Sequence, residues 1–152
     1  MNMIPNLQVI IIGEGEERKN LSWLAKRMEL DRIIWFVGRQ EYVRKWLNGF
    51  DVYIAINEET KLFDLEMILE AMLCRLPVIG FSGRGIEDLV KEKETGFILP
   101  GADADALAQM LINLEQDYIY RSNIGKRAEK MVADDFSRQK QIDSIKSIID
   151  NL

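Results

Sequence analysis

The chain has 152 residues, a net charge of −5, and 47% apolar and 30% charged residues, which are ordinary values for a soluble globular protein. The acidic balance, with no basic run longer than two residues, argues against nucleic acid as the main partner. The sequence contains no histidine and a single cysteine, Cys74, which excludes histidine bases, histidine or thiolate metal sites and internal disulfides.

The length predicts one domain spanning residues 1–152, long enough to bury a substantial core. The sequence contains no low-complexity segment, internal repeat or linker that would divide it. The apolar run near the N-terminus is too short for a signal or membrane helix, so the cytoplasm is the expected compartment.

Strand and helix patterns alternate along most of the chain. Continuous apolar, β-branched runs predict buried strands at 7–12, 33–37, 52–56, 78–81 and 96–99. Apolar residues at helical spacing predict helices at 16–30, 41–48, 65–72, 86–91, 104–115 and 117–132, with a last helix capped by Ser137. This order predicts an α/β fold: a Rossmann-like, mostly parallel sheet of about five strands with helices on both faces, followed by a helical C-terminal third.

The stretch Phe63–Phe81 reads FDLEMILEAMLCRLPVIGF. It predicts, in this order, the end of a loop, a short helix, a turn and a buried strand. Pro77 ends the helix, because proline clashes with a preceding helical turn. At the start of the helix, free backbone N–H groups and the positive end of the dipole point toward the sheet edge. Parallel sheets bind ligands at the carboxyl ends of their strands. We therefore expect a ligand here, with Glu70 as an acid in an otherwise apolar helix.

The turn Gly13-Glu14-Gly15 follows a strand and opens a helix, as a dinucleotide fingerprint does. Arg18 stands where the third glycine belongs, and Glu16 and Glu17 would repel a pyrophosphate together with Glu14. The interpretation favoured here is a tight turn whose acids complement the positive end of the following helix.

The sequences Leu-Glu-Ala-Met at 69–72 and Leu-Pro-Val-Ile at 76–79 resemble the C-terminal, donor-binding domain of the group 1 (family 4) glycosyltransferases of the GT-B fold. The stretches 33–39, 51–55 and 93–100 match further parts of the same pattern. The resemblance covers nearly the whole chain but only the later part of a donor domain. It implies that the first strand and helix, with an Arg and a Lys for the diphosphate, and the acceptor-binding N-terminal domain are absent here.

The resemblance also assigns binding residues, while it leaves the catalytic residues unknown. It implies that Glu70 accepts hydrogen bonds from the ribose hydroxyls of the donor. The residues near the donor phosphates would be Phe63, Asp64 and Leu65, and those near the base would be Gly38 and Arg39. Two departures weaken the expected site: Asp64 replaces a glycine near the phosphates, and Leu62 replaces a glutamate near the transferred sugar. A further departure is Arg75, which stands where the family usually has a glycine.

The function that the resemblance implies is nucleotide-sugar binding in a retaining, metal-independent glycosyltransferase that transfers a hexosyl group. The expected partners are the nucleotide-diphosphate sugar and an N-terminal domain or partner chain, and no cofactor or metal is expected. This chain alone is not expected to catalyse the transfer reaction. The alternative is a non-catalytic interaction or regulatory module that has kept the fold. A measurement of nucleotide binding distinguishes the transferase domain from the interaction module, because only the first needs to bind a nucleotide. The sequence does not identify the nucleotide, the sugar, the acceptor or any membrane association.

Overall fold

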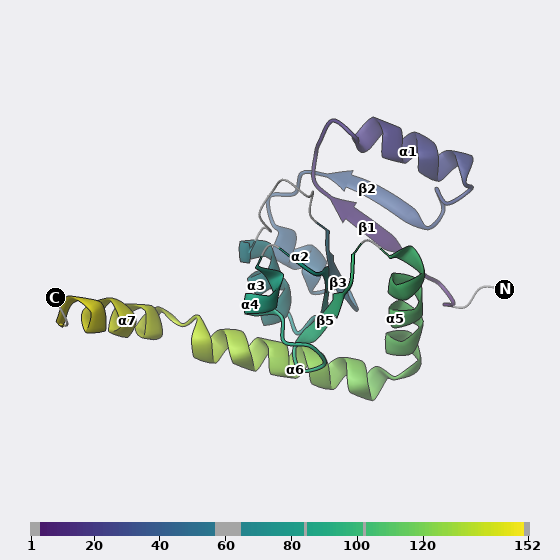
Figure 1. Cartoon of the computed structure of the whole chain (residues 1–152). Helices are drawn as coiled ribbons and strands as arrows, with labels where there is room; N and C mark the ends of the chain where they lie inside the picture. The colour runs from purple at the N-terminus through teal and green to yellow at the C-terminus, as the bar shows by residue number, and fades with distance from the viewer. Residues whose placement is uncertain (1–3, 57–64, 84, 102, 151–152) are drawn as a thin grey trace. The chain divides into compact units, whose positions relative to one another are not determined.

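The computed structural model describes residues 4–56, 65–83, 85–101 and 103–150 (Figure 1). The chain divides into two compact units, Met1–Trp46 and Leu47–Leu152, which are described separately. In the part of the chain that is described, no helix is long and apolar enough to cross a bilayer.

The first unit is a strand–helix–strand motif. Its elements are β1 (Val9–Ile12), α1 (Arg18–Arg27) and β2 (Ile34–Gly38). The strands pair in parallel with Val9 opposite Ile34, and an irregularity after Ile11 brings Ile12 opposite Gly38. The β1 strand is shorter than predicted, because its pairing begins where the Val9 N–H donates to the Ile33 carbonyl.

The helix α1 exposes most of its apolar stripe. The sequence predicts a helix at 16–30, and the observed helix ends earlier, before Glu29, which has a φ of +57°. On the shared apolar face, Ala25 is buried, whereas Leu21, Leu24 and Met28 are between 45% and 58% exposed. The periodicity therefore identifies the helix but does not identify which part of its apolar face is buried.

The second unit is built on a three-stranded parallel sheet in the order β3-β4-β5. Its strands are β3 (Tyr53–Ala55), β4 (Val78–Phe81) and β5 (Gly96–Leu99). Its helices are α3 (Leu65–Leu73), α4 (Ile86–Leu89), α5 (Ala104–Gln116), α6 (Tyr118–Asp135) and α7 (Arg138–Asp150), while α2 (Val43–Leu47) crosses the boundary between the units. The predicted α/β fold with parallel strands is confirmed, and the five strands of the described residues pair as two sheets.

The core of the second unit lies between the sheet and the helices α5 and α6. Its buried members are Ile79, Phe97, Leu99, Leu114 and Ile124. The strands β4 and β5 approach closely at Gly96, where an added Cβ would lie 2.2 Å from the Val78 carbonyl oxygen. The sheet is thus a packed scaffold whose strand ends have defined positions.

Polar side chains cap the N-termini of the helices α5 and α7. The Asp103 carboxylate accepts hydrogen bonds from the backbone N–H groups of Asp105 and Ala106 at the start of α5. The Ser137 hydroxyl accepts one from the Lys140 N–H at 3.3 Å, as predicted for the last helix. These side chains satisfy N–H groups that have no partner within the helix.

Candidate functional site

The carboxyl ends of β1 and β2 meet at two glycines. The Gly13 N–H donates to the Gly38 carbonyl oxygen at 2.9 Å, which ties the turn after β1 to the end of β2. Gly38 is buried and has a φ of +70°, a conformation that favours glycine. The next residue, Arg39, is exposed. Gly38 and Arg39, which the resemblance assigns to the base, therefore lie at the edge where parallel sheets bind ligands.

A carboxylate covers the backbone of Gly38. A Cβ added to Gly38 would lie 2.7 Å from Oε1 of Glu14, so a side chain at position 38 would displace this carboxylate. Arg18 holds the carboxylate, because its Nη1 donates to both oxygens of Glu14 at 2.9 and 3.1 Å. This ion pair was not predicted from the sequence, because Glu14 lies in the turn before α1 and not in the helix.

The corresponding edge of the second unit is formed by α3 after β3 and by α4 after β4. Leu65 is the first residue of α3 and is 45% exposed. Glu66 lies in the first turn of α3, where its charge complements the positive end of the helix dipole. The other two residues predicted near the phosphates, Phe63 and Asp64, lie outside the described residues.

Glu70 is half-buried on α3, between the buried residues Ile68 and Ala71. The helix is held firmly, because it packs against β3, β4, α4 and α6. Among the described residues, the Glu70 carboxylate forms no ion pair and accepts no hydrogen bond. A partly desolvated carboxylate with free acceptor oxygens is suited to bind a ligand that carries hydroxyl donors.

A second carboxylate at this edge already has a partner. Glu87 accepts a hydrogen bond from the Gly83 N–H at 2.6 Å, in the loop between β4 and α4. Hydrogen bonds from the backbone of Gly83, then of Glu87 itself and of Gly85, lower the pKa of Glu87. Gly83 and Gly85 have φ values of +110° and +87°. The contact of Glu87 with this loop was not predicted from the sequence, and its signal is an acid two residues after a Gly-x-Gly pair.

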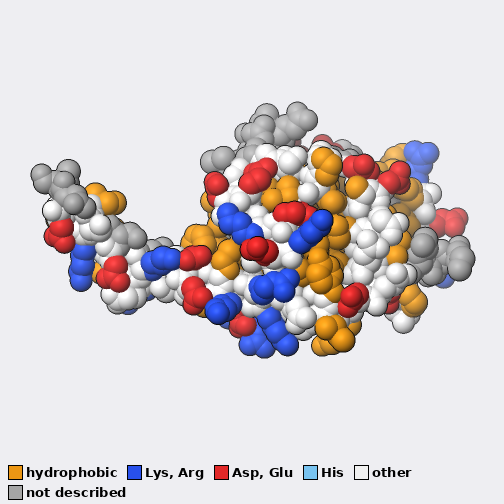
Figure 2. All heavy atoms as spheres, turned by 60° about the horizontal axis from the view of Figure 1, so that its bottom comes forward, with side chains coloured by type: hydrophobic (Ala, Val, Ile, Leu, Met, Phe, Trp, Pro, Cys, Tyr) orange, Lys and Arg blue, Asp and Glu red, His pale blue; other side chains and the backbone are white. Residues whose placement is uncertain are grey.

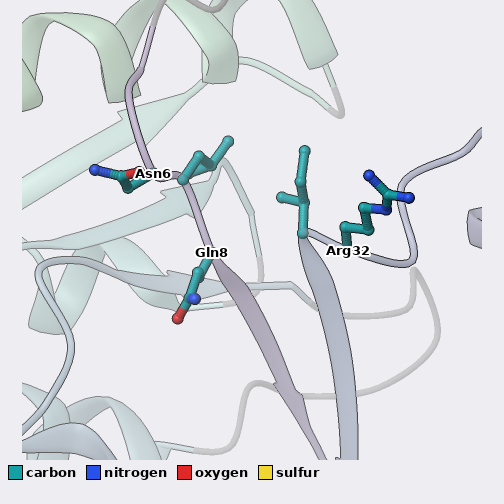
Figure 3. Close-up of a pocket in the computed structure, with 5 residues that line it drawn as sticks. Asn6, Gln8 and Arg32 are labelled. Carbon is teal, nitrogen blue, oxygen red and sulfur yellow. The ribbon is translucent and has the colours of Figure 1, made fainter.

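Two hollows among the described residues lie elsewhere. One, of about 280 Å³, is lined by Asn6, Leu7, Gln8, Arg32 and Ile33, where the strands β1 and β2 begin. In Figure 3, the side chains of Asn6 and Gln8 point away from Arg32, so its polar groups do not converge. The other, of about 150 Å³, lies at Asp51, Arg75 and Arg121, before β3 and β4 begin. Both lie at the amino ends of the strands, opposite the edge where parallel sheets bind ligands.

The surface around α6 carries charges of both signs. Arg75 pairs with Glu129 at 2.7 Å, and Arg121 pairs with Asp51 at 2.8 Å. On the face that Figure 2 shows, basic and acidic side chains are interspersed rather than segregated. In the described part of the chain, no group of three or more cysteines or acids is placed to hold a metal ion.

Comparisons with known proteins agree with this architecture. The family model described as "Glycosyl transferases group 1" matches residues 1–131. The N-acetyl-alpha-D-glucosaminyl L-malate synthase of Bacillus anthracis is 28% identical over 141 residues, which are 93% of this chain and 36% of that protein. A GDP-mannose-dependent mannosyltransferase of Corynebacterium glutamicum is 30% identical over 141 residues, which are 88% of this chain and 36% of that protein.

A solved structure shows the same fold. HepE of Anabaena, in complex with UDP, superimposes with a TM-score of 0.87 at 22% identity, over 97% of this chain and 42% of that protein. The chain thus spans well under half of the length of the relatives that it matches. The similarity covers both compact units of this chain.

Proposed function

Because the chain belongs to the group 1 glycosyl transferase family, we propose that it is the nucleotide-sugar-binding domain of a retaining glycosyltransferase. The whole enzyme would transfer a hexosyl group from a nucleotide-diphosphate sugar to an acceptor. In this proposal, residues 1–152 act together as one partial donor-binding domain. The remaining polypeptide or a partner chain supplies the acceptor site.

The observation that carries the proposal is the half-buried carboxylate of Glu70 on the packed helix α3, which has no hydrogen-bond or ion-pair partner among the described residues. A ribose offers two neighbouring hydroxyl donors, and a carboxylate offers two acceptor oxygens. Hydrogen bonds to a charged group contribute about 1.5–3 kcal/mol each. Glu70 therefore holds the ribose in this proposal, and the rigid helix sets the orientation of the nucleotide.

The other proposed contacts are made largely by the backbone. The N–H groups at the start of α3, near Leu65, face the phosphates, and Phe63 and Asp64 are assigned to the same region on the sequence alone. Gly38 and Arg39 lie near the base. In this proposal the protein contributes positioning and charge stabilisation of the leaving diphosphate, and the chain alone does not turn over.

Ligand-observed NMR of the folded chain against UDP, GDP and ADP tests the proposal. The choice of nucleotides follows from the relatives, since HepE is described with UDP and the mannosyltransferase is described as GDP-mannose-dependent. We expect one nucleotide to show saturation transfer, and an excess of the same unlabelled nucleotide to compete with it. A folded chain that binds none of the three would contradict the proposal.

The second candidate is a non-catalytic interaction or regulatory module. The carboxylates of Glu66 and Glu87 favour it, because both lie at the edge where a diphosphate would bind. A module of this kind needs no nucleotide affinity. A folded chain without nucleotide binding would therefore favour this candidate over the first.

A further inference from the structure

The short loop that follows β2 is held in place by one side chain. The amide nitrogen of Gln40 donates to the Val37 carbonyl oxygen at 2.7 Å, and the amide oxygen accepts a hydrogen bond from the Trp46 indole N–H at 3.2 Å. Gln40 and Trp46 are half-buried, which strengthens hydrogen bonds between them by excluding part of the water. Gln40 therefore connects the end of β2 to α2 and fixes the loop between them.

The fixed loop presents an aromatic side chain to solvent. Tyr42 is the last residue before α2 and is 61% exposed. The Lys45 ammonium lies 4.8 Å from the centroid of the Tyr42 ring, and the Lys45 N–H donates to the Tyr42 carbonyl oxygen at 3.1 Å. The attraction between the cation and the ring favours one orientation of the tyrosine. Tyr42 is thus a held aromatic surface that follows Gly38 and Arg39 at the carboxyl end of β2.

We propose that Tyr42 stacks on the base of the bound nucleotide, and that Gln40 positions Tyr42 by fixing the loop. The inference rests on the proposed function, in which Gly38 and Arg39 lie near the base. An aromatic ring stacks on the flat face of any base, because every base has a π-face. Tyr42 therefore contributes affinity for whichever base the site takes.

A second tyrosine has the same exposure and the same kind of contact at another place. Tyr118 is 67% exposed, and the Arg121 guanidinium carbon lies 5.5 Å from the centroid of its ring. It lines the hollow at Asp51 and Arg75, before β3 and β4 begin. Its place in the fold, and not exposure or a neighbouring cation, therefore distinguishes Tyr42, and Tyr118 is its matched control.

The experiment titrates UDP, GDP and ADP with the intact chain and its variants, and follows affinity and the NMR shifts of the base protons. The ring current of a stacked tyrosine moves these protons upfield in the bound state. We expect Tyr42→Ala to bind the nucleotide about tenfold more weakly than the wild type and to reduce the upfield shift. Tyr42→Phe should retain both, since stacking does not need the hydroxyl group. Tyr118→Ala should leave both unchanged.

A double-mutant cycle tests the positioning role of Gln40. Gln40→Ala removes the hydrogen bonds to Val37 and Trp46 and leaves the Tyr42 ring present. The affinity and the upfield shift should both fall, but less than in Tyr42→Ala. In a chain that already carries Tyr42→Ala, the same substitution should cause a smaller loss of affinity, because no ring is left to position.

The outcomes distinguish this inference from the proposed function. If Tyr42→Ala binds the nucleotide as tightly as the wild type, or if the bound base shows no upfield shift in the wild type, the stacking role is wrong and the proposed function stands. An equal loss from Gln40→Ala with and without Tyr42 would overturn the positioning role. Absence of binding by all three nucleotides to the folded wild type would overturn both the inference and the proposed function.

Discussion

Arg75 holds a backbone conformation that a glycine would adopt at lower cost. Its φ is +62°, in the turn between α3 and β4. The family pattern has a glycine at this place, and the left-handed conformation explains why, since a Cβ there costs about 1–2 kcal/mol. The exposed guanidinium forms an ion pair with Glu129, which raises the pKa of Arg75. Such exposed pairs stabilise a fold only weakly, so the pair offsets the strain only in part.

Two substitutions isolate this strain. Arg75→Ala removes the ion pair and keeps the Cβ, whereas Arg75→Gly removes both. We expect Arg75→Gly to be about 1 kcal/mol more stable than Arg75→Ala in urea denaturation. If the alanine variant is at least as stable as the glycine variant, the left-handed turn is not strained as described.

The carboxylate of Glu87 makes the stability of the fold depend on pH. Hydrogen bonds from the backbone of Gly83, and then of Glu87 and Gly85, lower the pKa of Glu87 in the folded chain. A group with a lowered folded pKa stabilises the fold above its unfolded pKa, and this stabilisation is lost as the pH falls through the folded pKa. We expect the wild type to unfold at a higher temperature than Glu87→Gln near pH 6. The difference should be smaller near about pH 3, below the ordinary value for a glutamate, because the stabilisation is lost as the pH falls through the folded pKa. A difference that is the same at both pH values would contradict this role of the carboxylate.

At the scale of elements, α6 packs against the turn after α3 through a glycine. A Cβ on Gly125 would lie 1.9 Å from the Arg75 carbonyl oxygen, which is a backbone atom that cannot move away easily. The helix α6 continues through Gly125 without a break. The glycine therefore allows the close approach of two elements and does not break the helix.

This contact predicts a large effect from a small substitution. Gly125→Ala should destabilise the fold by about 2 kcal/mol or more, because overpacking exceeds the gain in helix propensity. The matched control is Gly15→Ala, since a Cβ there meets nothing within 4 Å. Urea denaturation of both variants checks the prediction. Equal stability of the two variants would contradict it.

The elements were largely predictable from sequence, because apolar periodicity reports which residues a strand or helix can bury. The bounds of β4 and β5 agree with the sequence prediction. The early end of α1 and the short β1 were not predictable, because they depend on a positive φ at Glu29 and on pairing with β2. In the candidate site, the resemblance proposes roles for Glu70 and Gly38, and these roles stay predictions. The sequence pattern missed the contacts of Glu14 and Glu87, because these arise from loop backbone geometry that periodicity does not encode.

At the scale of the whole molecule, two compact units share one family match. The proposed base contacts, Gly38 and Arg39, belong to the first unit, and the proposed ribose contact, Glu70, belongs to the second. The described chain spans 36% of the synthase and the mannosyltransferase that it matches, so donor binding is the part of the activity that it can be tested for.

The most direct test of the account is the affinity of the bound nucleotide for Glu70→Ala, measured by NMR titration beside Glu66→Ala. Glu66 is the matched control, because it is an exposed glutamate one turn earlier on the same helix. We expect Glu70→Ala to lose about tenfold or more in affinity, the loss expected for one or two charge-assisted hydrogen bonds. Glu66→Ala should lose none.

A 2′,3′-dideoxynucleotide completes this measurement, since it lacks both ribose hydroxyls. It should bind the wild type as weakly as the ribonucleotide binds Glu70→Ala, and the substitution should not weaken its binding further. If Glu70→Ala binds the ribonucleotide as tightly as the wild type does, then Glu70 does not hold the ribose and the central claim is wrong.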